Sequence, residues 1–139
     1  MFAQHFGLKL KALVPVRGEP MVSHVVRTLR ASPLIGEIIV LCQEPDALRS
    51  AVDAAGGATL VESQSSISLS IKRQVDALGF SSPILVTTAD HPLLTVDMIA
   101  EFLGKADGDV AIAMVERKTM LAQFPDAKRT WLRFSDGAW

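Results

Sequence analysis

The chain has 139 residues, of which 49% are hydrophobic and 21% are charged, and its formal net charge at pH 7 is −1. This length suits one globular domain with a single hydrophobic core, and the composition excludes an intrinsically disordered chain. A net charge so close to zero gives no general attraction to nucleic acid or to an anionic membrane surface, so we expect neither as a partner.

Two further classes of protein are excluded by the same inspection. The single cysteine, Cys42, excludes an internal disulfide framework. No apolar stretch approaches the roughly 20 residues that span a bilayer. The opening residues MFAQHFGLKLK lack the apolar core and cleavage pattern of a signal peptide, so we expect a cytoplasmic protein.

The first half of the chain alternates short apolar runs with amphipathic segments, as α/β proteins do. A strand is predicted at 11–16 (KALVPV), before the turn-prone RGEP, and a helix at 20–33, where proline suits the first turn. The continuous apolar run 37–42 (EIIVLC) predicts a strand covered on both faces. A helix at 44–57 follows, ended by two glycines.

The second half continues this alternation. Strands are predicted at 58–63 and 83–88, and a helix at 65–79 with Ser65 or Ser66 as its N-cap. A helix at 95–106 has Thr95 as its expected N-cap. The remaining predictions are strands at 109–115 and 129–134, one or two helical turns at 118–124, and a turn at SDG (135–137).

Helices between successive strands predict right-handed crossovers and a mostly parallel sheet. In such sheets ligands bind outside the carboxyl ends of the strands, which directs attention to Asp90 at the end of PILVTT. A carboxylate there is expected to be paired, metal-bound or solvated, because an unpaired buried charge is costly. Asp90 fits either a Mg²⁺ site, which commonly uses only one or two carboxylates plus substrate phosphates, or a cap of the HPLLT turn.

The neighbouring His91 has no second histidine or cysteine at ligand spacing, so zinc is not expected and a loop histidine is favoured. Ser65, Ser66 and Ser68 stand where a helix begins. They fit simple capping or, because a hydroxyl both donates and accepts, contact with an anion or a nucleobase edge.

Lys11 precedes the first predicted strand and Arg17 follows it. A lysine ammonium is a compact charge suited to phosphate oxygens, although an ordinary surface lysine fits the position equally.

Taken in order, KALVPVRGEPMVSHVVRTLRAS, EIIVLC, SSISLSI and ILVTTADHPLLTVDMI resemble the MobA-like NTP transferases, the molybdenum-cofactor guanylyltransferase-like nucleotidyltransferases. The resemblance extends over about residues 5–135. It implies a Rossmann-like three-layer αβα sandwich with a mostly parallel sheet, of the glycosyltransferase-A type found in nucleotide-diphospho-sugar transferases.

The resemblance also implies roles for individual residues. Lys11 matches the lysine that contacts NTP phosphates, and Asp90 matches the aspartate that holds a catalytic Mg²⁺. Ser65, Ser66 and Ser68 lie where the base-recognition segment runs, and Gly18 and Pro20 match the turn before the first helix. The implied reaction transfers a nucleoside monophosphate from an NTP to a phosphorylated small-molecule acceptor and releases pyrophosphate.

The sequence also departs from the family pattern. Family members begin with a strand and a glycine-rich loop of the kind LAGGxxxR, and MFAQHFGLKLK resembles only the end of that loop. They also continue past the DG turn at which this sequence stops. We therefore expect residues 1–139 to form one incomplete nucleotidyltransferase-like domain, and an exposed sheet edge predicts a homo-oligomer.

Two alternatives remain open at the level of sequence. One is a catalytically inactive nucleotide-binding or oligomerising domain. The other is a flavodoxin-like receiver or mononucleotide-binding domain, although no acidic pair or phosphate loop stands near the first strand.

Overall fold

The computed structural model describes residues 2–79, 83–135 and 137–138. Its elements, in chain order, are the 3-10 helices η1 (Phe2–Phe6) and η2 (Lys11–Leu13), β1 (Pro15–Val16), β2 (Glu19–Pro20), α1 (Met21–Ala31), β3 (Ile39–Cys42), α2 (Pro45–Asp53), β4 (Thr59–Glu62), α3 (Ile67–Leu78), α4 (Val96–Lys105), α5 (Arg117–Gln123), β5 (Arg133–Phe134) and β6 (Gly137–Ala138). The chain divides into two units, Met1–Glu101 and Phe102–Trp139, which are described separately. The single domain expected from the sequence stays a prediction.

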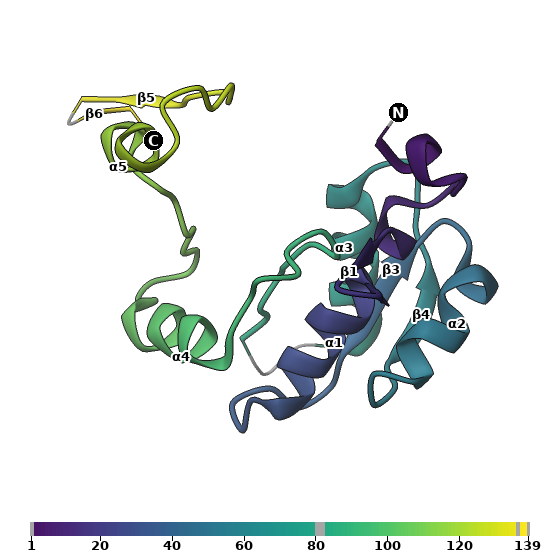
Figure 1. The fold of residues 1–139 in the computed structure, drawn as a ribbon. Coiled ribbons are helices and arrows are strands. Elements are labelled where there is room, and N and C mark those ends of the chain that lie inside the picture. Colours follow the sequence, from purple (N-terminus) through teal and green to yellow (C-terminus); the bar gives the residue numbers. More distant parts are fainter. Residues whose placement is uncertain (1, 80–82, 136, 139) are drawn as a thin grey trace. The chain divides into compact units, whose positions relative to one another are not determined.

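The first unit contains a parallel pair of strands joined by a helix (Figure 1). β3 and β4 pair in register from Ile39↔Thr59 to Cys42↔Glu62, and α2 lies between them in the chain. Pro45 stands at the start of α2, where its missing N–H costs no helical hydrogen bond. This β–α–β unit confirms the predicted α/β class with a parallel sheet.

The main hydrophobic core of the first unit lies between α1 and α2. Val22 and Val26, four residues apart on α1, are each 1% exposed, and Leu48 and Val52, four apart on α2, are 2% and 0% exposed. Residues four apart lie on one face of a helix, so each helix presents an apolar stripe to the other. The helices predicted at 20–33 and 44–57 are thus confirmed. Each begins one residue later than expected, and they end two and four residues earlier, at Ala31 and Asp53.

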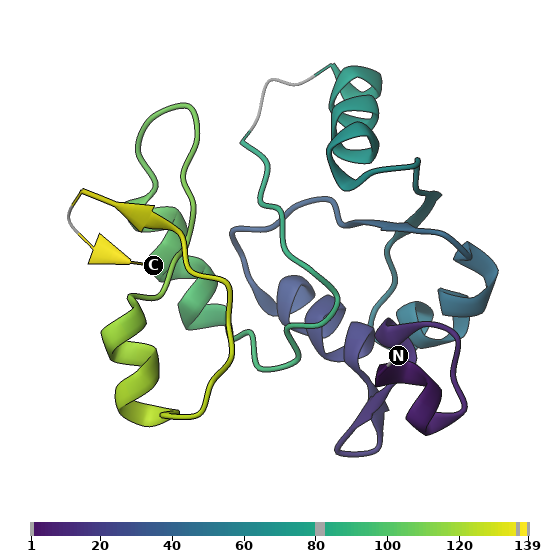
Figure 2. The ribbon, with the colours of Figure 1, turned by 90° about the horizontal axis from the view of Figure 1, so that it is seen from above.

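The strand predicted at 83–88 is not formed. Among the described residues, no strand pairs with this segment, which Figure 1 and Figure 2 draw as an extended coil. Ile84 and Val86 are 47% and 56% exposed. The apolar pattern therefore identified a segment with strand-like residues, but an isolated extended segment has no ladder hydrogen bonds to hold it as a strand.

The strand predicted at 11–16 is also wrong over most of its length. Residues 11–13 form η2, and only Pro15–Val16 is a strand, paired antiparallel with Glu19–Pro20. Residues 11–13 are instead held by a local 3-10 turn, in which the N–H of Leu13 donates to the carbonyl of Leu10 and the N–H of Val14 to that of Lys11, so these backbone groups are not available for a ladder. The two-residue turn after Val16, in which Arg17 (φ 51°) and Gly18 (φ 85°) both adopt positive φ, fixes the end of the short strand. A tight turn of this kind folds the chain back on itself and ends the strand.

The second unit contains α5 and a short hairpin of β5 and β6. The Arg117 guanidinium lies 5.9 Å from the centroid of the Trp131 ring, within the range of a cation–π contact. The strand predicted at 109–115 is extended but pairs with no described strand, and Val110 and Ile112 are 81% and 75% exposed. Of the strand predicted at 129–134, only the last two residues pair.

The SDG turn falls where β5 meets β6, with Ser135 in a turn, but Asp136 and Trp139 lie outside the described residues. None of the described helices combines the length and the apolar character needed to cross a membrane.

Candidate functional site

Lys11 is held at the start of η2 by the packing of the residues that follow it. Ala12 and Leu13 pack against the main core, and Val14 is 2% exposed. Two backbone hydrogen bonds close this turn, from the N–H of Leu13 to the carbonyl of Leu10 (3.1 Å) and from the N–H of Val14 to the carbonyl of Lys11 (3.0 Å). The backbone of Lys11 is therefore fixed, while its side chain is 55% exposed.

Asp90 lies in a turn that is anchored by the preceding residue. Ala89 packs against the same core, and the N–H of His91 donates to the carbonyl of Thr88 (3.3 Å). A second turn follows, in which the N–H of Leu94 donates to the carbonyl of His91 (3.0 Å). Within the described residues, the contacts found for the Asp90 carboxylate are with the side chains of Lys11 and Thr88 and not with an N–H group of this second turn.

The two side chains, 79 positions apart in the sequence, meet in an ion pair. Lys11 Nζ lies 2.5 Å from Asp90 Oδ2, and the Thr88 hydroxyl donates to Asp90 Oδ1 at 2.5 Å. The hydrogen bonds from Lys11 and then Thr88 lower the pKa of the Asp90 carboxyl from 3.8 to about 2. The Asp90 side chain is 37% exposed, so the pair sits at the surface, where incoming groups can reach it.

Thr88 is a site residue that the sequence prediction missed. Its hydroxyl occupies the carboxylate oxygen that Lys11 leaves unused, so the two residues together fix the orientation of the carboxylate. The signal was present, because a threonine two residues before an aspartate can reach that side chain across a turn.

The serine segment lies at the start of α3 as expected. Ser66 is the N-cap, and its hydroxyl accepts a hydrogen bond from the N–H of Leu69 (3.2 Å). Ser65 and Ser68 are exposed. No contact within the described parts of the chain joins Ser65, Ser66 or Ser68 to Lys11 or Asp90, so the structure does not bring these serines into the ion-pair site.

The serine that the sequence prediction passed over is Ser70, which is 5% exposed. Its hydroxyl donates to the carbonyl of Ser66 (2.8 Å) and accepts from the N–H of Gln64 (2.7 Å). Ser70 therefore ties the chain entering α3 to the first turn of that helix. A serine inside a helix that bonds back to the fourth preceding carbonyl is a known local pattern, but the sequence alone does not separate it from an exposed serine.

The donor set at the ion pair limits which metal it suits. Within residues 2–79, 83–135 and 137–138, no group of three His, Cys, Asp or Glu side chains is placed to hold a metal ion. Asp90 offers one carboxylate, and His91 is exposed with its Nδ1 3.5 Å from the Thr87 hydroxyl. A single oxygen ligand at the surface suits a cation that also binds substrate phosphates, and it does not suit a structural zinc ion.

Residues 3–132 match the family model of the MobA-like NTP transferase domain. The chain is 34% identical over 118 residues to the 3-deoxy-manno-octulosonate cytidylyltransferase of Geotalea daltonii (strain DSM 22248 / JCM 15807 / FRC-32), a match covering 84% of this chain and 46% of the relative. It is 29% identical over 100 residues to the bifunctional protein GlmU of Ralstonia pickettii (strain 12J), covering 71% of this chain and 22% of the relative.

A second 3-deoxy-manno-octulosonate cytidylyltransferase, from Geotalea uraniireducens (strain Rf4), is 29% identical over 117 residues and is likewise matched over 46% of its length. The chain thus spans less than half of the curated relatives that it matches. The family match covers nearly all of the chain, including both partners of the ion pair, and this chain belongs to the MobA-like NTP transferase family.

Proposed function

We propose that this chain carries the nucleotide-binding site of a nucleotidyltransferase that moves a nucleoside monophosphate from an NTP to a small-molecule acceptor. The observation that carries the proposal is the exposed pair of Lys11 and Asp90, which joins a cation for phosphate oxygens to a carboxylate for a divalent ion. In the reaction, an acceptor oxygen forms a bond to the α-phosphorus, and the bond from that phosphorus to the bridging oxygen breaks. Pyrophosphate leaves with the electron pair of the broken bond.

The ion pair is suited to exchange its partners when a nucleotide arrives. The Lys11 ammonium would leave Asp90 Oδ2 and bind triphosphate oxygens, where its charge is matched by more than one negative oxygen. The vacated carboxylate oxygen would then hold Mg²⁺, while Thr88 continues to fix the other oxygen. When bound, Mg²⁺ supplies neutralisation of the charge that builds on the phosphates. The chain's own contribution is positioning and electrostatic attraction.

The serine segment is proposed to contact the base. Ser65 and Ser68 are exposed, and the Ser66 hydroxyl, which accepts from Leu69, still has a proton to donate. Likeness to a cytidylyltransferase makes CTP the first triphosphate to test. The acceptor is proposed to be a phosphorylated small molecule, and the name of that relative adds a sugar acid as a second class to try. The expected homo-oligomer stays a prediction.

The proposal is tested by titration calorimetry of the chain with CTP, GTP, ATP and UTP, with Mg²⁺ and with EDTA, together with a pyrophosphate-release assay on both acceptor classes. We expect Asp90→Asn to remove the Mg²⁺-dependent part of the binding and Lys11→Met to weaken binding in both conditions. The exposed residues Asp53 and Lys9 provide matched controls, Asp53→Asn and Lys9→Met, which should bind as the wild type does. Nucleotide binding that is absent, or that Asp90→Asn leaves unchanged, would overturn the proposal.

A further inference from the structure

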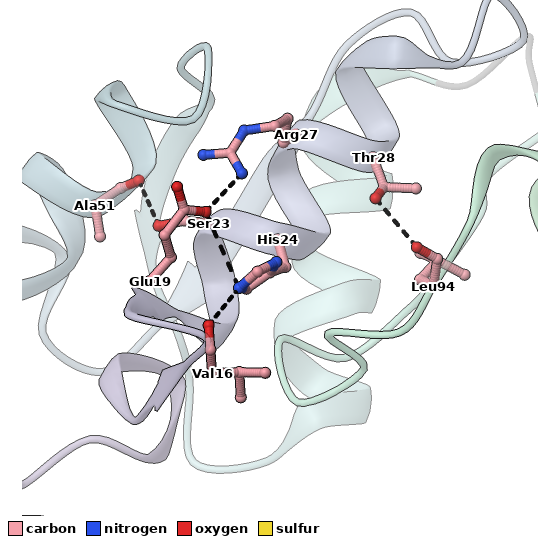
Figure 3. Close-up of polar contacts among 8 residues, drawn as sticks. All are labelled: Val16, Glu19, Ser23, His24, Arg27, Thr28, Ala51 and Leu94. Atoms are coloured by element: carbon pink, nitrogen blue, oxygen red, sulfur yellow. Dashed lines mark hydrogen bonds and ion pairs between the residues drawn. The ribbon is translucent and has the colours of Figure 1, made fainter.

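Helix α1 reaches three other segments of the first unit through polar side chains, each of which bonds to a backbone carbonyl (Figure 3). The three contacts are Ser23 Oγ to Ala51 O (2.9 Å), His24 Nε2 to Val16 O (2.8 Å) and Thr28 Oγ1 to Leu94 O (3.1 Å). The first holds α2. The second holds the strand that follows Lys11, and the third holds the loop that follows Asp90. One helix therefore supports both halves of the ion-pair site.

The loop of residues 88–95, called the Asp90 loop below, has few attachments to the rest of the first unit. Ala89 packs against the core, Asp90 binds Lys11, and the carbonyl of Leu94 accepts from Thr28. The segment before the loop, 83–88, is in no described strand and gives the loop no sheet to rest on. By contrast, α1 is firmly placed, because Val25 is 4% exposed and Val26 is 1% exposed.

The proposed function implies that these attachments change when the site is occupied. The proposed function moves Lys11 from Asp90 to the nucleotide phosphates, which removes one of the three attachments at the moment when Asp90 must hold a cation. The Thr28 contact involves neither Lys11 nor Asp90, because Leu94 lies four residues beyond Asp90 and its carbonyl faces α1. Leu94 also directly precedes Thr95, whose hydroxyl accepts a hydrogen bond from the N–H of Met98 (3.2 Å) and caps α4.

We propose that Thr28 is a positioning residue for the metal-bound state, acting on Asp90 through the carbonyl of Leu94. This inference rests on the proposed function, but it adds a residue outside the serine, lysine and aspartate positions given by the family resemblance. Thr28 itself touches neither nucleotide nor metal. Its role is to keep the carboxylate within reach of the cation once Lys11 has left.

The test compares Thr28→Val, which keeps the shape but loses the donor, with Thr28→Ser, which keeps the donor. For whichever of CTP, GTP, ATP and UTP the wild type binds most tightly, we expect Thr28→Val to weaken binding with Mg²⁺ by roughly tenfold, as other supporting hydrogen bonds at metal sites do. Binding in EDTA should be unchanged, because Lys11 still meets the phosphates. Thr28→Ser should restore the Mg²⁺-dependent binding, and the exposed Thr119 gives a matched control, Thr119→Val.

A second arm, amide hydrogen exchange of the chain without ligand, separates failure of this inference from failure of the proposed function. In Thr28→Val we expect faster exchange at the Leu94 amide and unchanged exchange at Val25 and Val26. Equal losses with Mg²⁺ and with EDTA, or no loss with Mg²⁺, would overturn the positioning role even though nucleotide binding stands. If the wild type binds no nucleotide, the proposed function fails, and unchanged exchange at Leu94 overturns the anchoring role as well.

Discussion

Breaking the ion pair between Lys11 and Asp90 should cost little folding stability, and the size of that cost can be worked from the structure. The perturbation is a double-mutant cycle of Lys11→Met, Asp90→Asn and the double variant. Each single change removes one charge and leaves the other at a surface position, where water can solvate it. The cycle isolates the coupling between the two side chains from the effects of each change alone.

The pKa of Asp90 sets an upper bound on this coupling. A fall in pKa from 3.8 to about 2 is about 1.8 units, which at 1.36 kcal/mol per unit is about 2.4 kcal/mol. Thr88 causes part of that fall, and with side chains 55% and 37% exposed, solvent screens the pair strongly. Exposed pairs are measured at about 0.2–1 kcal/mol, and we expect a coupling in that range at neutral pH. So weak a pair is easily exchanged for phosphate and metal.

The assay is urea unfolding of the four proteins at pH 7 in low salt and in 1 M NaCl, where the Debye length falls to about 3 Å, and again in low salt below pH 3.8. The folded pKa of Asp90 is depressed, so its stabilisation is complete above pH 3.8 and is lost as the pH falls through 3.8 toward about 2. We therefore expect the coupling free energy to be smaller in high salt than in low salt. We also expect it to be smaller below pH 3.8 than at pH 7, at pH values where the wild type is still folded. A coupling free energy that changes neither with salt nor with acid would refute the reasoning.

Two further predictions concern the turn after Lys11 and the serine segment. Arg17→Asn should stabilise the chain by about 0.5–1 kcal/mol, because asparagine tolerates the positive φ at that position better than arginine does; a melting temperature no higher than that of an Arg17→Lys control would contradict this. Ser66→Ala should cost about 1 kcal/mol in urea unfolding, since the hydroxyl caps α3. Ser68→Ala removes an exposed hydroxyl of the same helix and should cost much less, and equal losses would argue against the capping role.

The helices and the β3–β4 pair were predictable because their signals are local. The apolar spacing of α1, the proline and glycines that bound α2, and the run EIIVLC each lie within one short window of sequence. Ser66 as the N-cap of α3 was likewise one of the two residues expected. In these places propensity, pattern and packing all favour the same structure.

The strands at 83–88 and 109–115 could not be predicted correctly because a strand depends on a neighbour. PILVTT and DVAIAMV have strand-like residues, but no window of sequence states which backbone will supply their hydrogen bonds. The candidate site shows the same contrast between features with a local signal and features that depend on a distant partner. Lys11 and Asp90 were each singled out, yet their contact joins positions 79 apart, and the part played by Thr88 depends on that contact. The roles of Ser65 and Ser68 stay predictions.

The central claim, that Lys11 and Asp90 form a site where nucleotide and metal replace an ion pair, is tested most directly by nuclear magnetic resonance. The chemical shifts of the Lys11 ζ-ammonium and the Asp90 carboxylate carbon would be followed during titration with CTP, first in EDTA and then with Mg²⁺. We predict that CTP alone shifts the Lys11 signal, and that adding Mg²⁺ then shifts the Asp90 signal. Both signals unmoved while amides elsewhere respond to the nucleotide would contradict the account.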